Sequence, residues 1–351
     1  MADLDKRLEN MTPEILSRIA KIDEIKGRWI EGVNLSPQLL GRLKKSVLIT
    51  SSGSSTRIEG AKLSDEDVEK FIKGLAMNKF DNRSKQEVKS YYELLENVFG
   101  AWKNIPFNES SIKHLHKESL IYVEKDTRHR GDYKKTENKV EMLDGAGRPI
   151  GVIFDTTPAY LAPKQMDELV RWTALALEEK RYHPLLVIGN FIVEFLRIHP
   201  FQDGNGRLSR VLTNLLLLKS GYGFVPYVSH EKIIEDNKPG YYLALRKSQK
   251  TFGGKKEDII PWLEYFLTVL EKQADMAIDL LSMEKIESIL SPKQLLVWNY
   301  MLTMDESSAG EIVKKTGVLR PTVNQSLDRL LELKKIERIG MGRATRYKII
   351  K

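Results

Sequence analysis

The chain has 351 residues, enough for about two domains, and its 41% hydrophobic and 30% charged residues are typical of a globular protein and not of a disordered one. It contains no cysteine, which excludes disulfides, thiolate metal sites and cysteine nucleophiles and leaves six histidines as bases or ligands. The formal charge of +8 suits a polyanion or nucleotide partner but does not establish one. The start carries no apolar signal segment, and the longest apolar run, 185–198, is interrupted by Asn190 and Glu194, so we expect a soluble cytoplasmic protein with no membrane partner.

Apolar residues recur at helical spacing through most of the chain before residue 280, which predicts a mainly α protein. Between residues 130 and 163 apolar residues instead alternate around glycines, which predicts a small β-hairpin. Near residues 282–292 the pattern changes to three short helices and a second hairpin. We therefore expect an N-terminal helical region (1–100), a helical core with the hairpin (101–282) and a separate C-terminal domain (283–351).

The segment Ser55–Gly60 predicts the end of a helix that covers residues near 51–60. Ser55 and Glu59 are four positions apart and share one helix face, and Gly60 suits a C-terminal stop. Such a helix presents the Glu59 carboxylate to whatever lies beside it. An isolated pattern of this kind is usually only a solvated helix end, so its meaning depends on the rest of the chain.

The sequence HPFQDGNGRLSR, residues 199–210, lies between two apolar segments that predict buried helices, 184–198 and 208–218. Gly204, Asn205 and Gly206 let successive backbone N–H groups turn toward one point at the start of the second helix, which favours an anion there. Arg207 and Arg210 are three apart on one helix face and offer planar donors to phosphate oxygens. This loop therefore predicts a phosphate site.

Two further side chains of this loop suit chemistry on a phosphate. Asp203 supplies the hard oxygen ligand that Mg²⁺ needs on a di- or triphosphate. His199 has an ordinary pKa near neutrality, which suits a general base. Each residue alone has an ordinary structural explanation, but their combination within twelve positions indicates a catalytic site.

The twelve residues match the Fic signature, H-x-F-x-[DE]-G-N-G-R-x-x-R, at every defined position, so this part of the chain resembles a Fic domain. The resemblance implies an all-α domain that transfers AMP from ATP to a Ser, Thr or Tyr hydroxyl of a target protein and releases pyrophosphate. It implies that His199 deprotonates the target, that Asp203 holds Mg²⁺, and that the glycine-rich turn and the two arginines hold the phosphates. Among Fic relatives transfer of UMP, phosphate or phosphocholine also occurs, and the sequence leaves nucleotide selectivity and target open.

The resemblance extends to three other segments. The hairpin around Phe154, Asp155, Thr156 and Thr157 corresponds to the flap that pins the target segment by strand addition in this family. The pair Tyr241 and Tyr242 resembles the tyrosines on the adenine side, with Gln249 where relatives have Asn.

The stretch Ser55–Gly60 has the form [ST]-x-x-x-E-[GN] of the inhibitory helix of Fic proteins. The resemblance implies that Glu59 pairs with Arg210 and keeps that guanidinium from the γ-phosphate of ATP. The same carboxylate could instead orient water and hydrolyse an AMP–protein bond, so restraint of transfer and removal of AMP both remain open.

The last 67 residues contain 13 Lys and Arg against 7 Asp and Glu, so most of the net charge lies there. Residues 309–317 and 320–333 predict two helices, and the strands around Gly340 and Gly342 resemble the wing of a winged helix-turn-helix. Thr322, Asn324 and Gln325 would then face a DNA major groove, and Arg343 and Arg346 would contact phosphates. Winged helices also bind proteins or dimerise, so a protein partner is the alternative.

Taken together, the sequence predicts an AMP-transferase restrained by Glu59, with ATP as substrate, Mg²⁺ as cofactor, and a hydroxyl-bearing target protein as partner. We also expect a homodimer and consider duplex DNA a candidate partner of the C-terminal domain. Two alternatives remain open: a hydrolase that removes AMP from proteins, and a DNA-binding regulator whose Fic domain serves only as a sensor.

Overall fold

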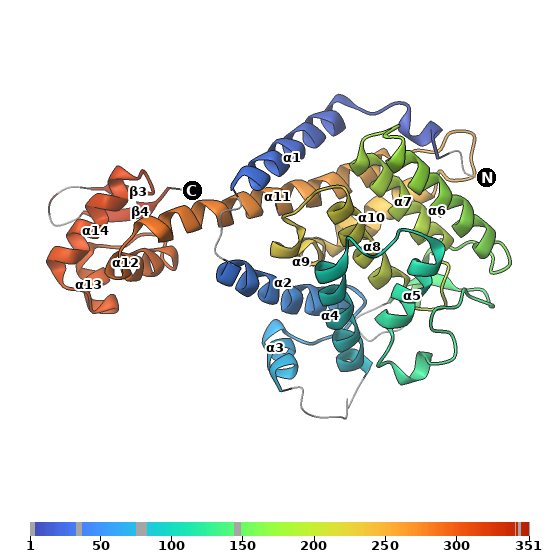
Figure 1. Ribbon diagram of the computed structural model, residues 1–351, viewed down its shortest axis with the longest axis horizontal. Helices are drawn as coiled ribbons and strands as arrows, with labels where there is room; N and C mark the ends of the chain where they lie inside the picture. Colours follow the sequence, from blue (N-terminus) through green and yellow to red (C-terminus); the bar gives the residue numbers. More distant parts are fainter. Residues whose placement is uncertain are drawn as a thin grey trace. The chain divides into compact units, whose positions relative to one another are not determined.

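The computed structural model describes residues 4–32, 37–74, 83–143, 149–340, 342 and 345–350. The chain divides into two compact units, Met1–Ile278 and Asp279–Lys351. Within the described ranges both units are mainly helical, and the strands form two separate two-stranded antiparallel sheets (Figure 1). No described helix is long and apolar enough to span a membrane.

The described residues of the first unit form eleven α-helices, of which the last continues into the second unit. Their bounds in chain order are α1 Pro13–Gly32, α2 Pro37–Ile58, α3 Asp65–Lys73, α4 Arg83–Ala101, α5 Glu109–Ser119, α6 Ala162–Glu178, α7 Pro184–Ile198, α8 Asn205–Lys219, α9 His230–Asp236, α10 Lys238–Gln249 and α11 Ile260–Ile289. Short 3₁₀ turns lie at Lys6–Leu8, Glu124–Asp126 and Val225–Tyr227. The expected boundary between residues 100 and 101 falls in the last turn of α4, and the three-part division stays a prediction.

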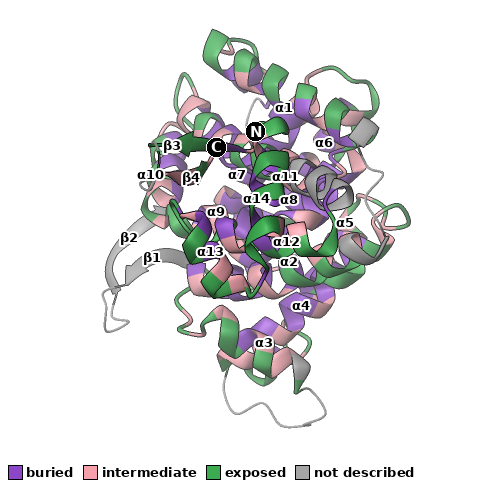
Figure 2. Cartoon of the chain, turned by 90° about the vertical axis from the view of Figure 1, so that its left-hand side faces the viewer, coloured by how far each residue is buried: buried purple, intermediate pink, exposed green. Residues whose placement is uncertain are grey.

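The core of the first unit is built around α7 and α8, whose apolar residues are almost all buried (Figure 2). Helix α7 packs against α6 on one side and α8 on the other, while α2, α4 and α5 contact α8. Nearly every residue of α7 and α8 is buried, so both helices need partners on every face, and the surrounding helices supply them. The loop that joins these two central helices is therefore enclosed by the rest of the unit.

The predicted hairpin is present, with β1 at Lys139–Leu143 and β2 at Pro149–Asp155. The strands pair antiparallel, with Lys139 opposite Asp155 and Val140 opposite Phe154, and two irregularities interrupt the register. Strand β2 lies beside α10. The hairpin thus begins and ends close to the segment 133–138, whose backbone meets the α7–α8 loop at a bridge between Tyr133 and Phe201.

The second unit has α12 Pro292–Leu302, α13 Ala309–Thr316 and α14 Arg320–Glu332, followed by β3 Ile336–Ile339 and β4 Arg346–Ile349. Gly317 ends α13 with a φ of 69°, a left-handed conformation that glycine adopts without strain, and Pro321 lies in the first turn of α14. The helices and β3 share a buried core that includes Trp298, Ile312 and Leu327. Three helices followed by an antiparallel hairpin is the element order of the predicted winged helix.

Candidate active site

The α7–α8 loop is shaped by two backbone conformations and one side-chain bridge. His199 directly follows α7 with φ 51° and ψ 58°, a left-handed conformation that ends the helix. Gly204 precedes α8 with φ 77°, so α8 begins at Asn205. The Asn205 side chain accepts a hydrogen bond from Phe201 N–H at 3.0 Å and donates one to Phe201 O at 2.7 Å. The side-chain amide of Asn205 therefore closes the loop.

A cavity of about 540 Å³ opens on this loop, within the ~300–1,000 Å³ typical of ligand pockets. It gathers most of the residues predicted for the site, from segments far apart in the chain. Those predicted residues are Glu59, His199, Asp203, Gly204, Asn205, Gly206, Arg207, Tyr241 and Tyr242. Glu87 and Arg83, which the sequence did not single out, also line the cavity.

His199 is oriented by its own helix. Its Nδ1 lies 3.3 Å from Leu196 O, and because a carbonyl only accepts, we assign the ring proton to Nδ1. Nε2 then keeps a free lone pair. Burial lowers the pKa of His199 to about 4, and the nearby Lys134 ammonium acts in the same direction, so the imidazole is neutral at pH 7. A neutral ring with a free Nε2 is the form that a general base requires.

Arg210 is buried and its guanidinium is held by the end of α2. It donates to Ser55 Oγ and Ser55 O, both at 2.9 Å, and to Glu59 Oε1 at 2.7 Å. Burial opposes its charge, but Glu59 outweighs this and raises the pKa of Arg210. Glu59 itself lies one residue beyond α2, in a turn that ends at Gly60 with φ 103°. The predicted helix near 51–60 thus ends at Ile58, and Glu59 reaches Arg210 from the following turn.

Gly206 explains how Glu59 fits. A Cβ at this position would clash with Glu59 Oε1, so the carboxylate occupies the space that a side chain would fill. Gly206 is in the first turn of α8, where free N–H groups and the helix dipole favour an anion. Glu59 therefore places a negative charge where the sequence predicts a phosphate.

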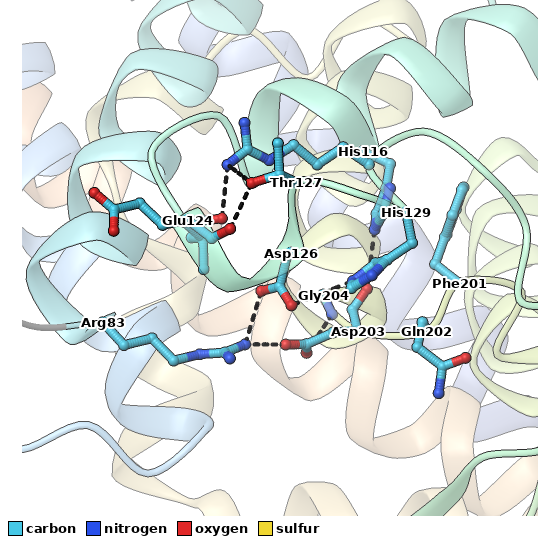
Figure 3. Close-up of polar contacts among 12 residues, drawn as sticks. Arg83, His116, Glu124, Asp126, Thr127, His129, Phe201, Gln202, Asp203 and Gly204 are labelled. Carbon is cyan, nitrogen blue, oxygen red and sulfur yellow. Dashed lines mark hydrogen bonds and ion pairs between the residues drawn. The ribbon is translucent and has the colours of Figure 1, made fainter.

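The other two charged groups of the loop are also held by opposite charges. Arg207 Nη1 lies 3.1 Å from Glu87 Oε1. Asp203 forms an ion pair with Arg83, which also reaches Asp126 at 3.0 Å, as Figure 3 shows. Burial opposes ionisation of Asp203, but Arg207 and Arg83 hold its pKa below its ordinary value. All three charges expected to contact a metal–nucleotide are thus paired within the protein.

The donors of the site fit a phosphate. Arg207 Nε and Nη1 and Arg210 Nη1 are buried without a hydrogen-bond partner among the described residues, because the contact from Arg207 to Glu87 lacks hydrogen-bond geometry. Buried guanidinium donors in this state favour an anionic ligand. The described residues contain no group of three or more His, Asp or Glu side chains that could hold a metal. Asp203 fits Mg²⁺ as a single carboxylate ligand whose other ligands are phosphate oxygens and water, once Arg83 leaves it.

His116 supports the loop from α5 and was not found from the sequence. Its Nδ1 accepts the Gly131 N–H at 2.9 Å, so Nε2 carries the proton that it donates to Asp203 O at 2.9 Å. Its ring stacks on Phe201 with centroids 3.8 Å apart (Figure 3). Burial lowers the pKa of His116 to about 4. A histidine 87 residues away along the chain therefore fixes the backbone at the candidate metal ligand.

The predicted adenine side is aromatic. Tyr241 is buried against Trp262, with ring centroids 5.8 Å apart, and Tyr242 lies edge-on to it at 5.2 Å. Leu245, one turn further along α10, completes this wall of the cavity. Gln249 donates to Val193 O at 3.2 Å and faces α7 instead.

The residues predicted for the flap divide into two pairs. Phe154 and Asp155 lie in β2, and their side chains are outside the described part of the structure. Thr156 Oγ1 donates toward Asn138, whose O and Oδ1 lie 2.8 and 2.7 Å away. Thr157 is buried and its hydroxyl donates to Gln165 at 2.8 Å. The two threonine hydroxyls therefore anchor the hairpin internally.

The described candidate DNA-contacting residues of the second unit lie on α14 and β4. Asn324 and Gln325 are exposed on α14, and Thr322 is half-buried beside them. Arg346 lies 3.3 Å from Glu306 and 3.4 Å from Glu311, so its guanidinium faces two carboxylates. Arg343 is outside the described residues.

Comparison with known sequences places a family match over the centre of the chain. Residues 106–217 match the model of the Fic/DOC family. A probable protein adenylyltransferase of Aquifex aeolicus is 31% identical over 119 residues, 33% of this chain and 36% of that protein. The protein adenylyltransferase Fic of Aedes aegypti is 32% identical over 95 residues, 27% of this chain and 17% of that protein. The chain thus spans well under two thirds of the length of these curated relatives.

Solved structures share the fold over a longer stretch. A Fic family protein from Desulfovibrio desulfuricans has a TM-score of 0.64 and 25% identity over 97% of both chains. A Fic domain containing signaling protein from Bacteroides thetaiotaomicron has a TM-score of 0.61 and 24% identity, and the match covers 75% of this chain and 98% of that one. The predicted mainly helical fold is confirmed. The chain therefore carries a Fic/DOC domain at residues 106–217, which contains the whole α7–α8 loop.

Proposed function

We propose that this chain transfers AMP from ATP to a hydroxyl group of a protein, and that Glu59 restrains the transfer. The observation that carries the proposal is the convergence of His199, Asp203 and Arg207 on one cavity at the start of α8. The curated relatives named as protein adenylyltransferases support the same activity.

The reaction divides its tasks among few residues. The target oxygen bonds to the α-phosphorus, the bond from that phosphorus to pyrophosphate breaks, and the hydroxyl proton passes to His199 Nε2. The N–H groups at the start of α8 and the Arg207 guanidinium hold the phosphate oxygens as charge shifts toward pyrophosphate. Mg²⁺ at Asp203 would neutralise part of the phosphate charge. The tyrosine wall at Tyr241 offers its rings and apolar edges to the base.

Restraint follows from the contacts of Glu59. While its carboxylate binds Arg210 and fills the space over Gly206, a third phosphate group meets a negative charge in place of a guanidinium. ATP then binds without the alignment that in-line attack needs. Loss of the carboxylate frees Arg210 without removing any residue assigned to proton transfer or phosphate binding.

The test is incubation with ATP labelled at the α-phosphate, with wild type, Glu59→Gly and Glu59→Gly/His199→Ala compared for label on the protein. We expect weak self-labelling by wild type, stronger labelling by Glu59→Gly and none above background by the double variant. Absence of label from Glu59→Gly with ATP bound would remove the proposed activity. The same assay with labelled UTP, GTP and CTP measures nucleotide selectivity.

Removal of AMP is the second candidate, because Glu59 and His199 line the same cavity and a carboxylate there can orient water. Chain labelled by Glu59→Gly, freed of ATP and mixed with unlabelled wild type, tests this directly. Release of labelled AMP by wild type but not by Glu59→Gly would assign the hydrolase activity to Glu59.

For the second unit we propose duplex DNA as partner, supported by its excess of basic residues and by the exposed Asn324 and Gln325 on α14. Fluorescence anisotropy of labelled duplex with the full chain, between low and high salt, tests this. Salt-sensitive binding supports DNA contact, and its absence with self-association indicates a protein-binding module. Light scattering of the same samples checks the expected homodimer.

A further inference from the structure

Lys134 is a buried lysine beside the cavity that the proposed reaction does not use. It is 4% exposed, and its Nζ donates to Asn138 Oδ1 at 2.8 Å, Thr156 Oγ1 at 2.9 Å and Ile198 O at 3.3 Å. An ammonium has three N–H groups, so all three have acceptors. Burying such a charge opposes folding, and an apolar side chain could fill the space without that cost. The fully partnered ammonium therefore indicates a role that depends on these contacts.

Two contacts of Lys134 lie on either side of His199. Its Nζ holds Ile198 O, and its backbone N–H donates to Pro200 O at 2.8 Å. Between these carbonyls His199 has φ 51° and ψ 58°, a left-handed conformation that is unfavourable for a residue with a Cβ. Such backbone strain persists only where the surroundings hold it. Lys134 supplies that hold on both neighbours of His199.

The remaining contacts of Lys134 reach the base of the hairpin. Asn138 immediately precedes β1, and Thr156 immediately follows β2. The two residues are joined by the Thr156 hydroxyl, and Asn138 Nδ2 also donates to Phe201 O at 2.9 Å. The ammonium thus lies at the point where both strands of the hairpin meet the α7–α8 loop.

We propose that Lys134 is a positioning residue that fixes the direction of the His199 imidazole and joins the base of the hairpin to the catalytic loop. This inference rests on the proposed AMP transfer, in which His199 accepts the proton. A target segment held by the hairpin would then present its hydroxyl to an imidazole fixed in the same frame. Misplacement of reacting groups by about 1 Å costs on the order of 100-fold in rate.

The charge of Lys134 offers a measurement that does not need catalysis. The charged groups that face His199 are Lys134, Glu59 and Asp203; Lys134 lowers the pKa of His199, and the two carboxylates raise it. Burial lowers the pKa of Lys134 itself to about 8, with Glu137 partly opposing, so the ammonium is charged at neutral pH. Removal of this charge should raise the pKa of His199.

The experiment compares Lys134→Met, Lys134→Arg and Lys135→Met, each in the Glu59→Gly background. Lys135 is the exposed neighbour of Lys134 and serves as the matched control. We expect Lys134→Met to slow single-turnover self-labelling about 10–100-fold, with ATP affinity within about three-fold of the parent. Lys134→Arg should recover part of the rate because it keeps the charge and the donors, and Lys135→Met should match the parent.

NMR titration of the histidine rings, with His199 assigned by its loss in His199→Ala, is the second readout. We expect a higher His199 pKa in Lys134→Met and no change in Lys135→Met. Parental labelling by Lys134→Met would overturn the proposal. If the Glu59→Gly parent transfers no AMP, the proposed function fails while the titration still decides, because an unchanged His199 pKa in Lys134→Met then overturns the inference.

A variant that keeps the ammonium covers the case in which Lys134→Met does not fold. Thr156→Val removes the hydroxyl that accepts from Lys134 at the end of β2. Lys134 keeps its other two acceptors, Asn138 Oδ1 and Ile198 O. We expect slower self-labelling than the parent, with ATP affinity and the His199 titration unchanged. A parental rate for Thr156→Val would overturn the link between the hairpin and the loop.

Discussion

The α7–α8 loop and the second unit hold their candidate functional groups in opposite ways. Next to the loop, in the first turns of α8, the Arg207 and Arg210 guanidiniums are buried and paired with Glu87 and Glu59. On α14, Asn324 is exposed. Burying a charge is costly unless an opposite charge or a ligand compensates it, so the buried ion pairs point to a charged ligand. An exposed amide can instead hydrogen-bond to many kinds of molecule. The buried and paired groups of the first region therefore indicate a specific chemistry, whereas the exposed groups of the second unit indicate only a polar binding surface.

We expect the largest loss of activity when His199, the first residue of the α7–α8 loop, is replaced. His199→Ala in the Glu59→Gly background should reduce self-labelling by about 10²–10⁴-fold, because the target hydroxyl loses its proton acceptor. ATP affinity should stay within a few-fold, since the imidazole is not assigned to nucleotide binding. The exposed His114→Ala is the matched control and should leave labelling unchanged. Retained labelling by His199→Ala would take this residue out of the mechanism.

The next effect concerns stability and pH. His116 has a pKa of about 4 in the folded chain because it is buried, against about 6.5 when unfolded. The neutral ring is favoured by folding, so its stability contribution is complete above pH 6.5 and is lost as the pH falls toward 4. The loss amounts to about 3 kcal/mol in the free energy of unfolding.

Urea unfolding of wild type and His116→Asn between pH 7 and pH 4 measures this contribution. The difference in stability between the two proteins should shrink as the pH falls. His114→Asn, which replaces an exposed ring, should instead stay parallel to wild type. A constant difference for His116→Asn would show that folding does not lower the pKa of this ring.

A smaller change in labelling rate tests the coupling between Glu59 and Arg210. Glu59→Gly should increase self-labelling, and Arg210→Ala in that background should cancel the gain, because we expect the freed guanidinium to bind the γ-phosphate. Coupling between contacting residues is typically about 0.5–3 kcal/mol. A four-protein cycle of labelling rates gives this coupling. Equal effects of Arg210→Ala with and without Glu59 would indicate that the two side chains act independently.

The smallest expected effect lies in the second unit. Each phosphate contact that is lost lowers the salt dependence of DNA binding by about one unit of slope. Since Arg346 faces Glu306 and Glu311, Arg346→Ala should lower the slope by less than that, while Glu306→Gln/Glu311→Gln should raise it. Anisotropy at several salt concentrations measures both slopes. Identical slopes in all variants would place the DNA surface elsewhere.

The sequence was most informative where the residues of one site lie close together along the chain. The signature 199–210 predicted a single site, and its histidine, acid, glycines and Arg207 line one cavity, because these residues lie within one turn and the start of one helix. The pairing of Ser55 and Glu59 on one side of a helix was likewise predicted from local spacing. The spacing did not show that the helix ends before Glu59, because the end of a helix depends on hydrogen bonds of its last turn and here on Gly60.

Residues that act through distant partners could not be found in this way. His116 and Lys134 lie 87 and 64 residues from the carbonyls they hold, and Arg83 lies 120 residues from Asp203. No periodicity or motif marks these residues, since their meaning depends on how α5, the segment before β1 and the start of α4 pack on the loop. The sequence assigned Asn205 only a backbone N–H and did not indicate that its side-chain amide closes the loop.

The position of Glu59 after α2 determines how fast the restraint that we propose can be lifted. Two residues near the C-terminal end of α2 hold the helix in place. The Ser51 hydroxyl lies 2.7 Å from a carboxylate oxygen of the buried Glu231, and Arg57 donates to Glu235 at 2.5 Å. Glu59 follows these anchors, next to the permissive Gly60, so it can rotate away while the helix stays in place. Rearrangement of such a turn takes nanoseconds to microseconds, whereas release of a packed helix belongs to local unfolding at microseconds to seconds. We expect the restrained and released states to exchange many times during a single catalytic cycle.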